Sequence, residues 1–140
     1  MTAMEVDRSG CEVLPRVECL RLLSSHSLGR LGLHAGALPL ILPVAYAFVD
    51  DSIVVRTHDH SQLYRATRDS VVAFEVDAPP GADGGGWSVH VTGLAQEVTD
   101  PVELARLRPL PLRPWARAGE ERFVRISVEL LSGRRVLPAA

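Results

Sequence analysis

The sequence predicts a mainly β protein, a six-stranded antiparallel barrel with short flanking helices. The chain of 140 residues is long enough for one domain that buries a core without disulfide or metal staples. Its apolar, strand-like runs are separated by short turn signals, which is typical of antiparallel strands joined by hairpins. Leu40–Val44 and Val71–Val76 carry apolar residues on both faces, so we expect a closed barrel with a covered outer wall. The expected cover is a second copy of the chain, in a homodimer.

The first part of the chain combines a polar arm, a helix and two strands. We expect residues 1–13 to form a flexible arm and residues 14–140 to form the single domain. The helix is predicted over Pro15–Ser25, because Pro suits a first helical turn and apolar residues then recur at helical spacing. Leu28–His34 and Leu38–Phe48 follow as strands, joined by a turn that contains glycine.

A tight turn and a second helix come next. Asp50-Asp51 is expected to connect the preceding strand to a strand over Ser52–Thr57. Asp59 is expected to cap a short helix that runs to about Arg68, and Gln62 completes a capping-box pattern with it. This helix would therefore begin close to the end of the strand.

The second part of the chain holds three more strands and a third helix. Val71–Val76 is a predicted strand, and the glycine-rich residues 78–86 are a predicted loop. Trp87–Val98 alternates well between its two faces. Asp100-Pro101-x-Glu103 combines a cap, a first-turn Pro and a capping-box Glu, which together open a helix. Arg122–Leu131 is the sixth predicted strand.

Composition excludes several classes of function. The net charge of −2 provides no basic field for nucleic acid. All 15 basic residues are Arg, which excludes a Schiff base to lysine and thus a lysine-linked pyridoxal enzyme. Cys11 and Cys19 fit no CxxC pattern and are expected to be reduced thiols. The N-terminus lacks an apolar signal core, and Ala37–Val49 is too short to span a bilayer, so we expect a cytoplasmic protein.

An anion site is predicted where the Ser52–Thr57 strand ends and the next helix begins. The cation of Arg56 and the free N–H groups of a helix N-terminus would converge there, which favours a phosphate. Taken by itself, an Arg at a strand end is more often a surface ion-pair partner. Trp87 and Trp115 are likewise more often core or interface anchors than cofactor contacts.

Six motifs resemble one known family in their order and spacing, although no single motif is decisive. They are SHSLGRLGL (25–33), LPVAYAF (42–48), VVRTHDHSQL (54–63), VAFEVD (72–77), GWSVHVTGLAQEVTDP (86–101) and LPLRPW (110–115). The chain is similar to the flavin-binding split-barrel proteins related to pyridoxamine 5′-phosphate oxidase. Within them it looks closest to the small actinobacterial branch grouped with nitroimidazole-resistance-type flavoproteins.

The resemblance implies an FMN-binding split barrel that binds its flavin at a homodimer interface. One strand would lie along the isoalloxazine ring, the next would reach toward the ring and the phosphate arm, and the following helix start would hold the phosphate. Two residues further along would line the same cleft, and Trp115 would close it from across the interface. In that order, the implied cofactor-binding residues are Pro43, Val44 and Tyr46; Arg56 and Thr57; Ser61, Gln62 and Leu63; Trp87 and Ser88; and Trp115.

One position departs from the family pattern. The family usually has Lys where this chain has Gln62, so a point charge toward a dianionic phosphate is replaced by a neutral hydrogen-bonding group. Arg56, Arg65 or Arg68 are possible sources of compensating charge. Otherwise the cofactor is held more weakly, or it is a different one.

His58 and His60 are the candidates for a catalytic group. They flank Asp59, but no third ligand stands at an obvious spacing, so no metal site is expected. Either His is a candidate proton donor near a flavin edge, because His titrates near neutrality.

Two functions fit the sequence. The first is an FMN-dependent oxidoreductase that acts on an unidentified small organic substrate. The alternative is a slow or non-catalytic cofactor-binding protein on the same scaffold, a carrier or sensor that binds flavin, the deazaflavin F420 or haem.

Overall fold

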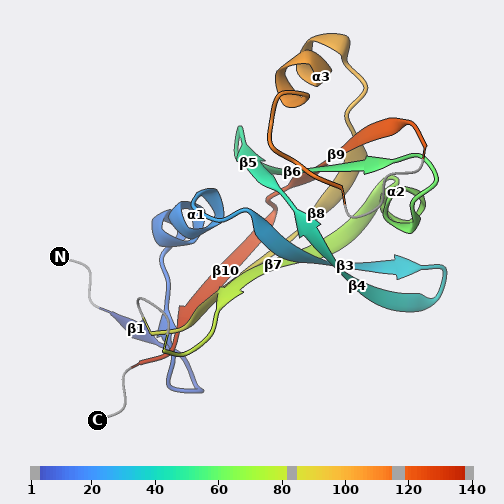
Figure 1. The fold of residues 1–140 in the computed structure, drawn as a ribbon. Helices are drawn as coiled ribbons and strands as arrows, with labels where there is room; N and C mark the ends of the chain where they lie inside the picture. Colours follow the sequence, from blue (N-terminus) through green and yellow to red (C-terminus); the bar gives the residue numbers. More distant parts are fainter. Residues whose placement is uncertain (1–3, 82–84, 115–118, 138–140) are drawn as a thin grey trace.

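The fold is that of a computed structural model, which describes residues 4–81, 85–114 and 119–137. Within these ranges the chain is mainly β, with short helices between some of the strands (Figure 1). The helices are α1 (Arg16–Ser24), α2 (Gln62–Thr67) and α3 (Pro101–Leu107). The strands are β1 (Glu5–Val6), β2 (Glu12–Val13), β3 (Leu28–Ala35), β4 (Leu38–Ala45), β5 (Ala47–Val49), β6 (Ser52–His58), β7 (Ser70–Ala78), β8 (Trp87–Glu97), β9 (Glu121–Ser127) and β10 (Leu130–Arg135).

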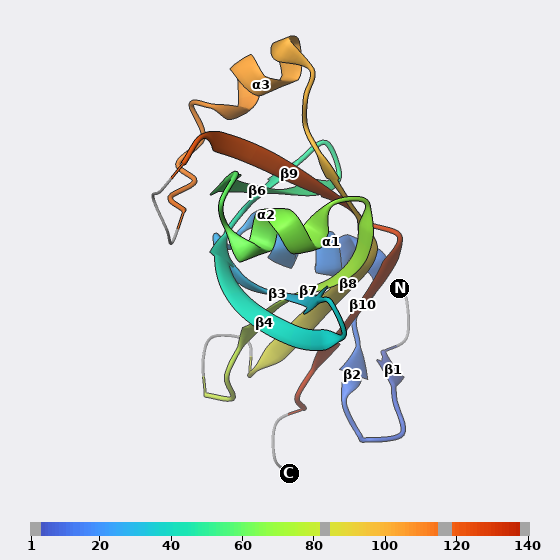
Figure 2. The same cartoon turned by 90° about the vertical axis from the view of Figure 1, so that its right-hand side faces the viewer.

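The strands form one antiparallel sheet that divides at β8. One path runs β1-β2-β10-β8-β7-β3-β4, while β8 also pairs with β9, which continues through β6 to β5. Because β5 follows β4 directly along the chain, the two paths curve back toward each other. Figure 2 shows α2 between the β6–β9 pair and the β3–β4 pair, with α3 beyond β9. The predicted antiparallel, mainly β fold is therefore confirmed.

Two clusters of buried side chains hold these layers together. The larger fills the barrel and includes Leu31, Ile53, Val89 and Ile126, each with no exposed surface. Burial of such a side chain contributes about 1.5–3 kcal/mol. The smaller cluster lies under α3, and through its buried Leu112 it fixes the segment after that helix.

Two features that neighbouring residues predict, a tight turn and a helix cap, are present in the structure. Asp50 and Asp51 have φ values of 49° and 57°, and Val49 pairs with Ser52 across them. Positive φ at both central residues is what a two-residue hairpin needs to match the strand twist. In α3, the Asp100 side chain accepts the Glu103 N–H at 3.0 Å, as expected for an N-cap.

The strand count differs from the six predicted because two of the predicted strands each divide into two and the N-terminal segment adds β1 and β2. The Leu38–Phe48 run breaks at Tyr46, whose N–H donates to Ser27 O at 3.0 Å and whose hydroxyl donates to Leu23 O at 2.6 Å. Tyr46 thereby becomes a core anchor between β4 and β5. Its edge also meets the ring of Phe74, with centroids 4.8 Å apart.

The Arg122–Leu131 run divides into β9 and β10 at the point where the chain passes Gly93 of β8. A Cβ at Gly93 would come within 1.6 Å of the Ser127 carbonyl oxygen, so only glycine permits this backbone approach. The bend lets β8 pair with β9 at one end and with β10 along the rest.

Two short strands lie within the segment that the sequence predicts as a flexible arm. β1 and β2 form a short hairpin, and β2 pairs with β10 through Val13 opposite Arg134. Helix α1 is tied to the same strand, because Glu18 accepts hydrogen bonds from Arg21 and from Arg135. These partners, Arg21 foremost, lower the pKa of Glu18 to about 2. No helix in the described ranges is both long and apolar enough to cross a membrane.

Candidate functional site

A cavity of about 370 Å³ opens where β4, β6 and the start of α2 meet the segment that follows α3. The strands supply an apolar wall, and the helix start and the end of β6 supply polar groups. Its lining residues are Leu42, Pro43, Val44, Ala45, Val55, Arg56, Thr57, His58, His60, Ser61, Gln62, Leu63, Arg113 and Pro114. We call this the β4–α2 cavity.

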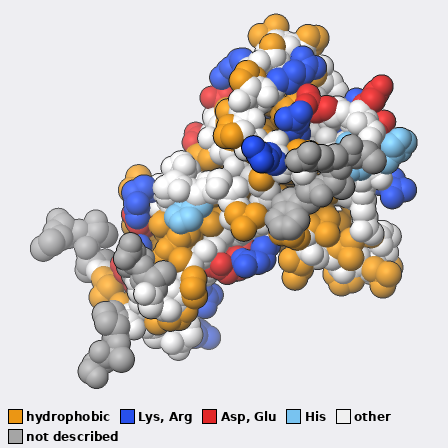
Figure 3. All heavy atoms as spheres, viewed as in Figure 1, with side chains coloured by type: hydrophobic (Ala, Val, Ile, Leu, Met, Phe, Trp, Pro, Cys, Tyr) orange, Lys and Arg blue, Asp and Glu red, His pale blue; other side chains and the backbone are white. Residues whose placement is uncertain are grey.

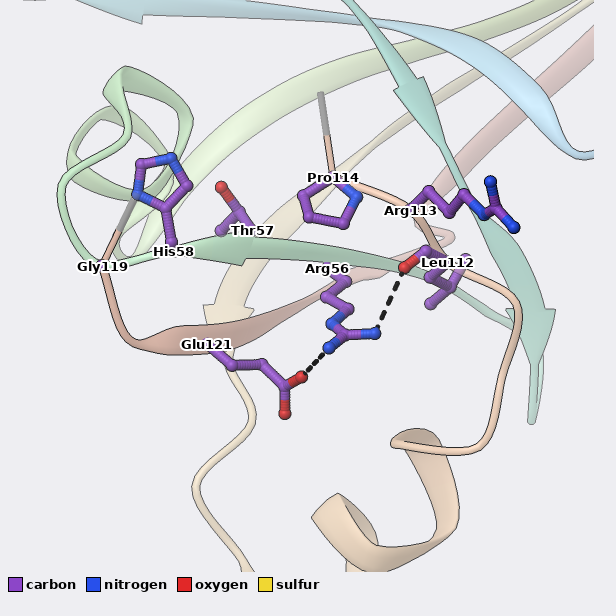
Figure 4. Close-up of a pocket in the computed structure, with 8 residues that line it drawn as sticks. All are labelled: Arg56, Thr57, His58, Leu112, Arg113, Pro114, Gly119 and Glu121. Atoms are coloured by element: carbon purple, nitrogen blue, oxygen red, sulfur yellow. Dashed lines mark hydrogen bonds and ion pairs between the residues drawn. The ribbon is translucent and has the colours of Figure 1, made fainter. Parts of the chain in front are cut away.

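A second cavity, of about 320 Å³, adjoins the first. The two cavities share part of their lining, and the second also reaches Leu112, Gly119 and Glu121. Figure 4 shows His58 and Thr57 on one side of Pro114, and Arg113 on the other. We call this the Glu121 cavity. The two spaces meet along the end of β6.

Arg56 reaches the Glu121 cavity but is already engaged by the protein. Its guanidinium forms an ion pair with Glu121 and lies 3.5 Å from the Leu112 carbonyl oxygen, to which it donates (Figure 4). It also stands 6.0 Å from the centre of the Phe123 ring. Arg56 is therefore an ion-pair partner, as is usual for an Arg at a strand end, and it also lines the cavity wall.

The start of α2 is organised by Ser61 rather than by Asp59. Ser61 Oγ accepts the Tyr64 N–H at 3.0 Å and lies 2.6 Å from Thr57 Oγ1. The predicted Asp59 cap is wrong, because Asp59 Oδ1 accepts the Glu120 N–H at 2.9 Å instead. Asp59 thus ties the β6–α2 turn to the strand start of β9, while Ser61 serves as the N-cap.

The side chains after Ser61 divide between the rim and the interior. Gln62 is exposed at the rim of the β4–α2 cavity, and Leu63 is buried in its wall. Neither Arg65 nor Arg68 lines this cavity; Arg68 instead lies 5.5 Å from the Tyr64 ring centre. The charge missing at Gln62 is therefore not supplied by these two Arg residues within one chain.

The two candidate His residues have opposite environments. His58 is only 7% exposed, and neither ring nitrogen has a hydrogen-bond partner among the described residues. His60 is exposed and lies 3.7 Å from Asp59 Oδ1. Both line the β4–α2 cavity, but His58 alone also reaches the Glu121 cavity. Among the residues that the structure describes, no group of three His, Cys, Asp or Glu side chains could hold a metal ion.

Several predicted contacts lie elsewhere in the protomer. Pro43 and Val44 line the β4–α2 cavity, but Tyr46 belongs to the core and does not. Trp87 and Ser88 line a separate cavity beside Arg30. Trp87 is buried there, with its ring edge-on to His26 and 4.8 Å between the centroids. The structure therefore does not bring these three residues to the predicted cleft within one chain. Trp115 falls outside the described residues.

Sequence reasoning missed the contributions of the segment after α3 and of the start of β9. Arg113 and Pro114 line both cavities, and Gly119 and Glu121 line the second. Their positions depend on long-range pairing, since His58 of β6 lies opposite Glu121 of β9. The adjacent Arg113-Pro114 pair was visible in the sequence, but nothing local indicated which strand it would cover.

Comparison with known proteins supports the observed fold. A family model described as pyridoxamine 5′-phosphate oxidase matches residues 15–135. An uncharacterized protein of Mycobacterium tuberculosis is 40% identical over 129 residues, which is 89% of this chain and 84% of that protein. The structure of the FAD binding protein from Mycobacterium smegmatis is 30% identical with a TM-score of 0.76, covering 89% of this chain and 99% of its own.

A third similar protein has no stated function. It is a protein from Corynebacterium diphtheriae, 33% identical with a TM-score of 0.72, and the match covers 91% of this chain and 98% of that one. The match to the family model extends over β3 to β10, α2 and α3. On this basis the chain belongs to the pyridoxamine 5′-phosphate oxidase family.

Proposed function

We propose that this protein is a flavin-dependent oxidoreductase that binds its flavin in the β4–α2 cavity and acts on a small organic substrate. The observation that carries the proposal is the cavity's division into an apolar wall and a polar end. Leu42, Pro43, Val44 and Val55 form the wall, while Thr57, Ser61 and Gln62 lie at the other end. A flavin nucleotide has the matching division into a flat ring and a phosphate ester.

The described residues fit a flavin in a second respect. The buried ring of His58 has nitrogens without a partner at the polar end, and buried polar groups are nearly always hydrogen-bonded. The similar Mycobacterium smegmatis protein is an FAD binding protein, which supports the same class of cofactor here. A bound flavin would supply hydride or electron transfer.

The chain's own residues would position the cofactor and shield it. Pro43 and Val44 would pack against the ring and exclude water from one of its faces. Ser61 and Thr57 would offer hydroxyl groups to the phosphate. Pro114 would cover the site from the segment after α3. No described residue is required as a covalent nucleophile, since the flavin carries the redox chemistry.

We also propose that the functional unit is a homodimer. Large apolar side chains are exposed on β3, β4 and β7, and Figure 3 shows hydrophobic atoms gathered at the β3–β4 end of the molecule. Ile41 is 74% exposed, Leu38 70% and Val71 66%. Extended apolar patches of this kind mark association surfaces. A second copy would cover them, and it could bring further residues to the flavin.

The visible absorption spectrum of the purified protein tests the proposal. Flavin bands support it, and chromatography of the released cofactor then distinguishes FMN, the form predicted from the sequence, from FAD. A Soret band would favour haem instead, and a deazaflavin spectrum would favour F420. A colourless protein that also fails to bind added FMN or FAD would contradict a flavin function.

Turnover is tested separately with the flavin-loaded protein. Reduction of the bound flavin by NADH or NADPH, followed by rapid reoxidation with a small organic acceptor, is expected of an oxidoreductase. A flavin that is bound but exchanges no electrons with any donor or acceptor would instead favour the carrier or sensor alternative.

A further inference from the structure

Among the residues that the structure describes, the polar end of the β4–α2 cavity has no cation at position 62, and Arg56 can serve a phosphate there only in competition with Glu121. Gln62 is neutral, and the guanidinium of Arg56 is paired with Glu121. Arg113 lies on the other side of Pro114 from His58, as Figure 4 shows. A phosphate bound near Ser61 would therefore need another donor from the residues around it.

His58 has the properties that such a donor requires. Its side chain is more than nine-tenths buried, at the point where both cavities meet, and its two ring nitrogens have no partner in the described part of the chain. An imidazole always carries at least one N–H donor, and an imidazolium carries two. Gly119 lies beside the ring, since a Cβ added there would be 3.4 Å from His58 Nδ1.

The neighbouring hydroxyl pair leaves one further donor free. Ser61 Oγ accepts the Tyr64 N–H and shares a hydrogen bond with Thr57 Oγ1. Whichever of the two hydroxyls donates in that bond, the hydrogen of the other remains available to a third group. The end of β6 and the cap of α2 thus carry an imidazole N–H and a free hydroxyl O–H on residues that line the same cavity.

We propose that His58 binds a phosphate oxygen of the flavin nucleotide and so replaces the cationic side chain that is absent at Gln62. The inference rests on the proposed flavin site. It assigns to His58 a role in binding the cofactor, whereas the exposed His60 contributes little. The ligand chemistry is a phosphate ester, which both FMN and FAD provide and which riboflavin lacks.

The test compares FMN and FAD, which carry a phosphate on the ribityl chain, with riboflavin, which lacks it. Dissociation constants for FMN, FAD and riboflavin are measured by flavin fluorescence with the cofactor-free wild type, with His58→Leu and with His58→Gln. His58→Leu should weaken the binding of FMN and FAD by about tenfold to a hundredfold, because a hydrogen bond to a charged group is lost. Its affinity for riboflavin should not change, and His58→Gln, which keeps one donor, should lie between.

A matched control and a rescue sharpen the result. His90→Leu removes an exposed His that lines neither cavity, and it should bind FMN like the wild type. Adding Gln62→Lys to His58→Leu should restore FMN affinity, because a Lys charge would return to the phosphate. In the wild type, the ¹⁵N resonances of the His58 ring should shift on addition of FMN but not of riboflavin.

The outcomes separate this inference from the proposed function. If the wild type binds FMN and His58→Leu binds FMN equally well, the role of His58 is refuted while the flavin site stands. The role is also refuted if His58→Leu loses as much affinity for riboflavin as for FMN. The same holds if the His58 resonances do not respond to FMN. If the wild type binds neither FMN, FAD nor riboflavin, the proposed function is wrong and this inference falls with it.

Discussion

The ion pair between Arg56 and Glu121 gives the sharpest quantitative prediction about the site. Arg56→Ala removes a cation at the wall shared by the two cavities. Hydrogen bonds to charged groups contribute about 1.5–3 kcal/mol. The side chains of Arg56 and Glu121 are 33% and 30% exposed, so water screens them in part and the lower end of that range applies. We therefore expect FMN to bind about 10-fold to 30-fold more weakly.

Part of that loss should come from Glu121 rather than from the missing Arg56 contact. Without Arg56, the Glu121 carboxylate keeps Arg108 as a partner at 3.4 Å, but its charge remains at the wall of the cavity. A phosphate would then face a nearby anion. The double variant Arg56→Ala/Glu121→Gln should accordingly bind FMN more tightly than Arg56→Ala alone. Glu121→Gln alone should bind it more tightly than the wild type, because Arg56 is released from its pair.

The assay is a double-mutant cycle of FMN dissociation constants. Arg108→Ala is the matched control, since Arg108 contacts the same carboxylate but does not line either cavity. Its affinity for FMN should equal that of the wild type. An Arg56→Ala variant that is folded and binds FMN with unchanged affinity would refute the reasoning.

Three further predictions concern the fold and the assembly. The pKa of Glu18 is lowered from 4.5 to about 2, chiefly by Arg21, so its contribution is complete above pH 4.5 and is lost as the pH falls toward 2. Between pH 4.5 and pH 2, the free energy of unfolding of Glu18→Gln in urea should fall by about 1 kcal/mol less than that of the wild type, allowing for solvent screening. An equal fall in the two proteins would refute this. Gly93→Ala should lower the free energy of unfolding by about 1–3 kcal/mol. Gly32→Ala is the control and should have little effect, because the nearest atom to its Cβ lies at an ordinary contact distance of 3.6 Å. Equal losses of stability in the two variants would contradict the role of close packing at Gly93. Ile41→Arg should convert the proposed dimer to monomer in light scattering, and a dimer like that of the wild type would exclude this face as the interface.

The features that the sequence predicted well are those set by a few neighbouring residues. The Asp50-Asp51 turn and the Asp100 cap formed as expected, because their geometry depends on backbone within three residues. The apolar pattern also identified the strands, since alternation reflects which face is buried. These local signals were sufficient for the fold class.

The errors arose where contacts between distant segments outweighed local preference. Asp59 was predicted as a cap, but it binds the Glu120 N–H, which only the pairing of β6 with β9 brings near. The Tyr46 side chain is likewise held in the core, where its hydroxyl donates to the Leu23 carbonyl oxygen, while its place beside a flavin stays a prediction. Periodicity does not encode such partners, so it could not separate core anchors from cavity residues.

The same reason explains which part of the site was predictable. Arg56, Thr57, Ser61 and Gln62 lie within one short stretch, and the structure places all of them at the β4–α2 cavity. Glu121 is far away in the sequence, and nothing near it indicated that it would engage Arg56. The burial of His58 likewise follows from the strand register and not from its neighbours along the chain.

The central claim is that the β4–α2 cavity binds a flavin, and a crystal structure of the protein with FMN tests it most directly. We expect the ring to lie against Pro43 and Val44, with a phosphate oxygen within hydrogen-bond distance of the His58 ring and the Ser61–Thr57 hydroxyls. Flavin density at another place on the molecule would contradict the claim, whereas a phosphate that lies in this cavity without contacting His58 would refute only the role of His58.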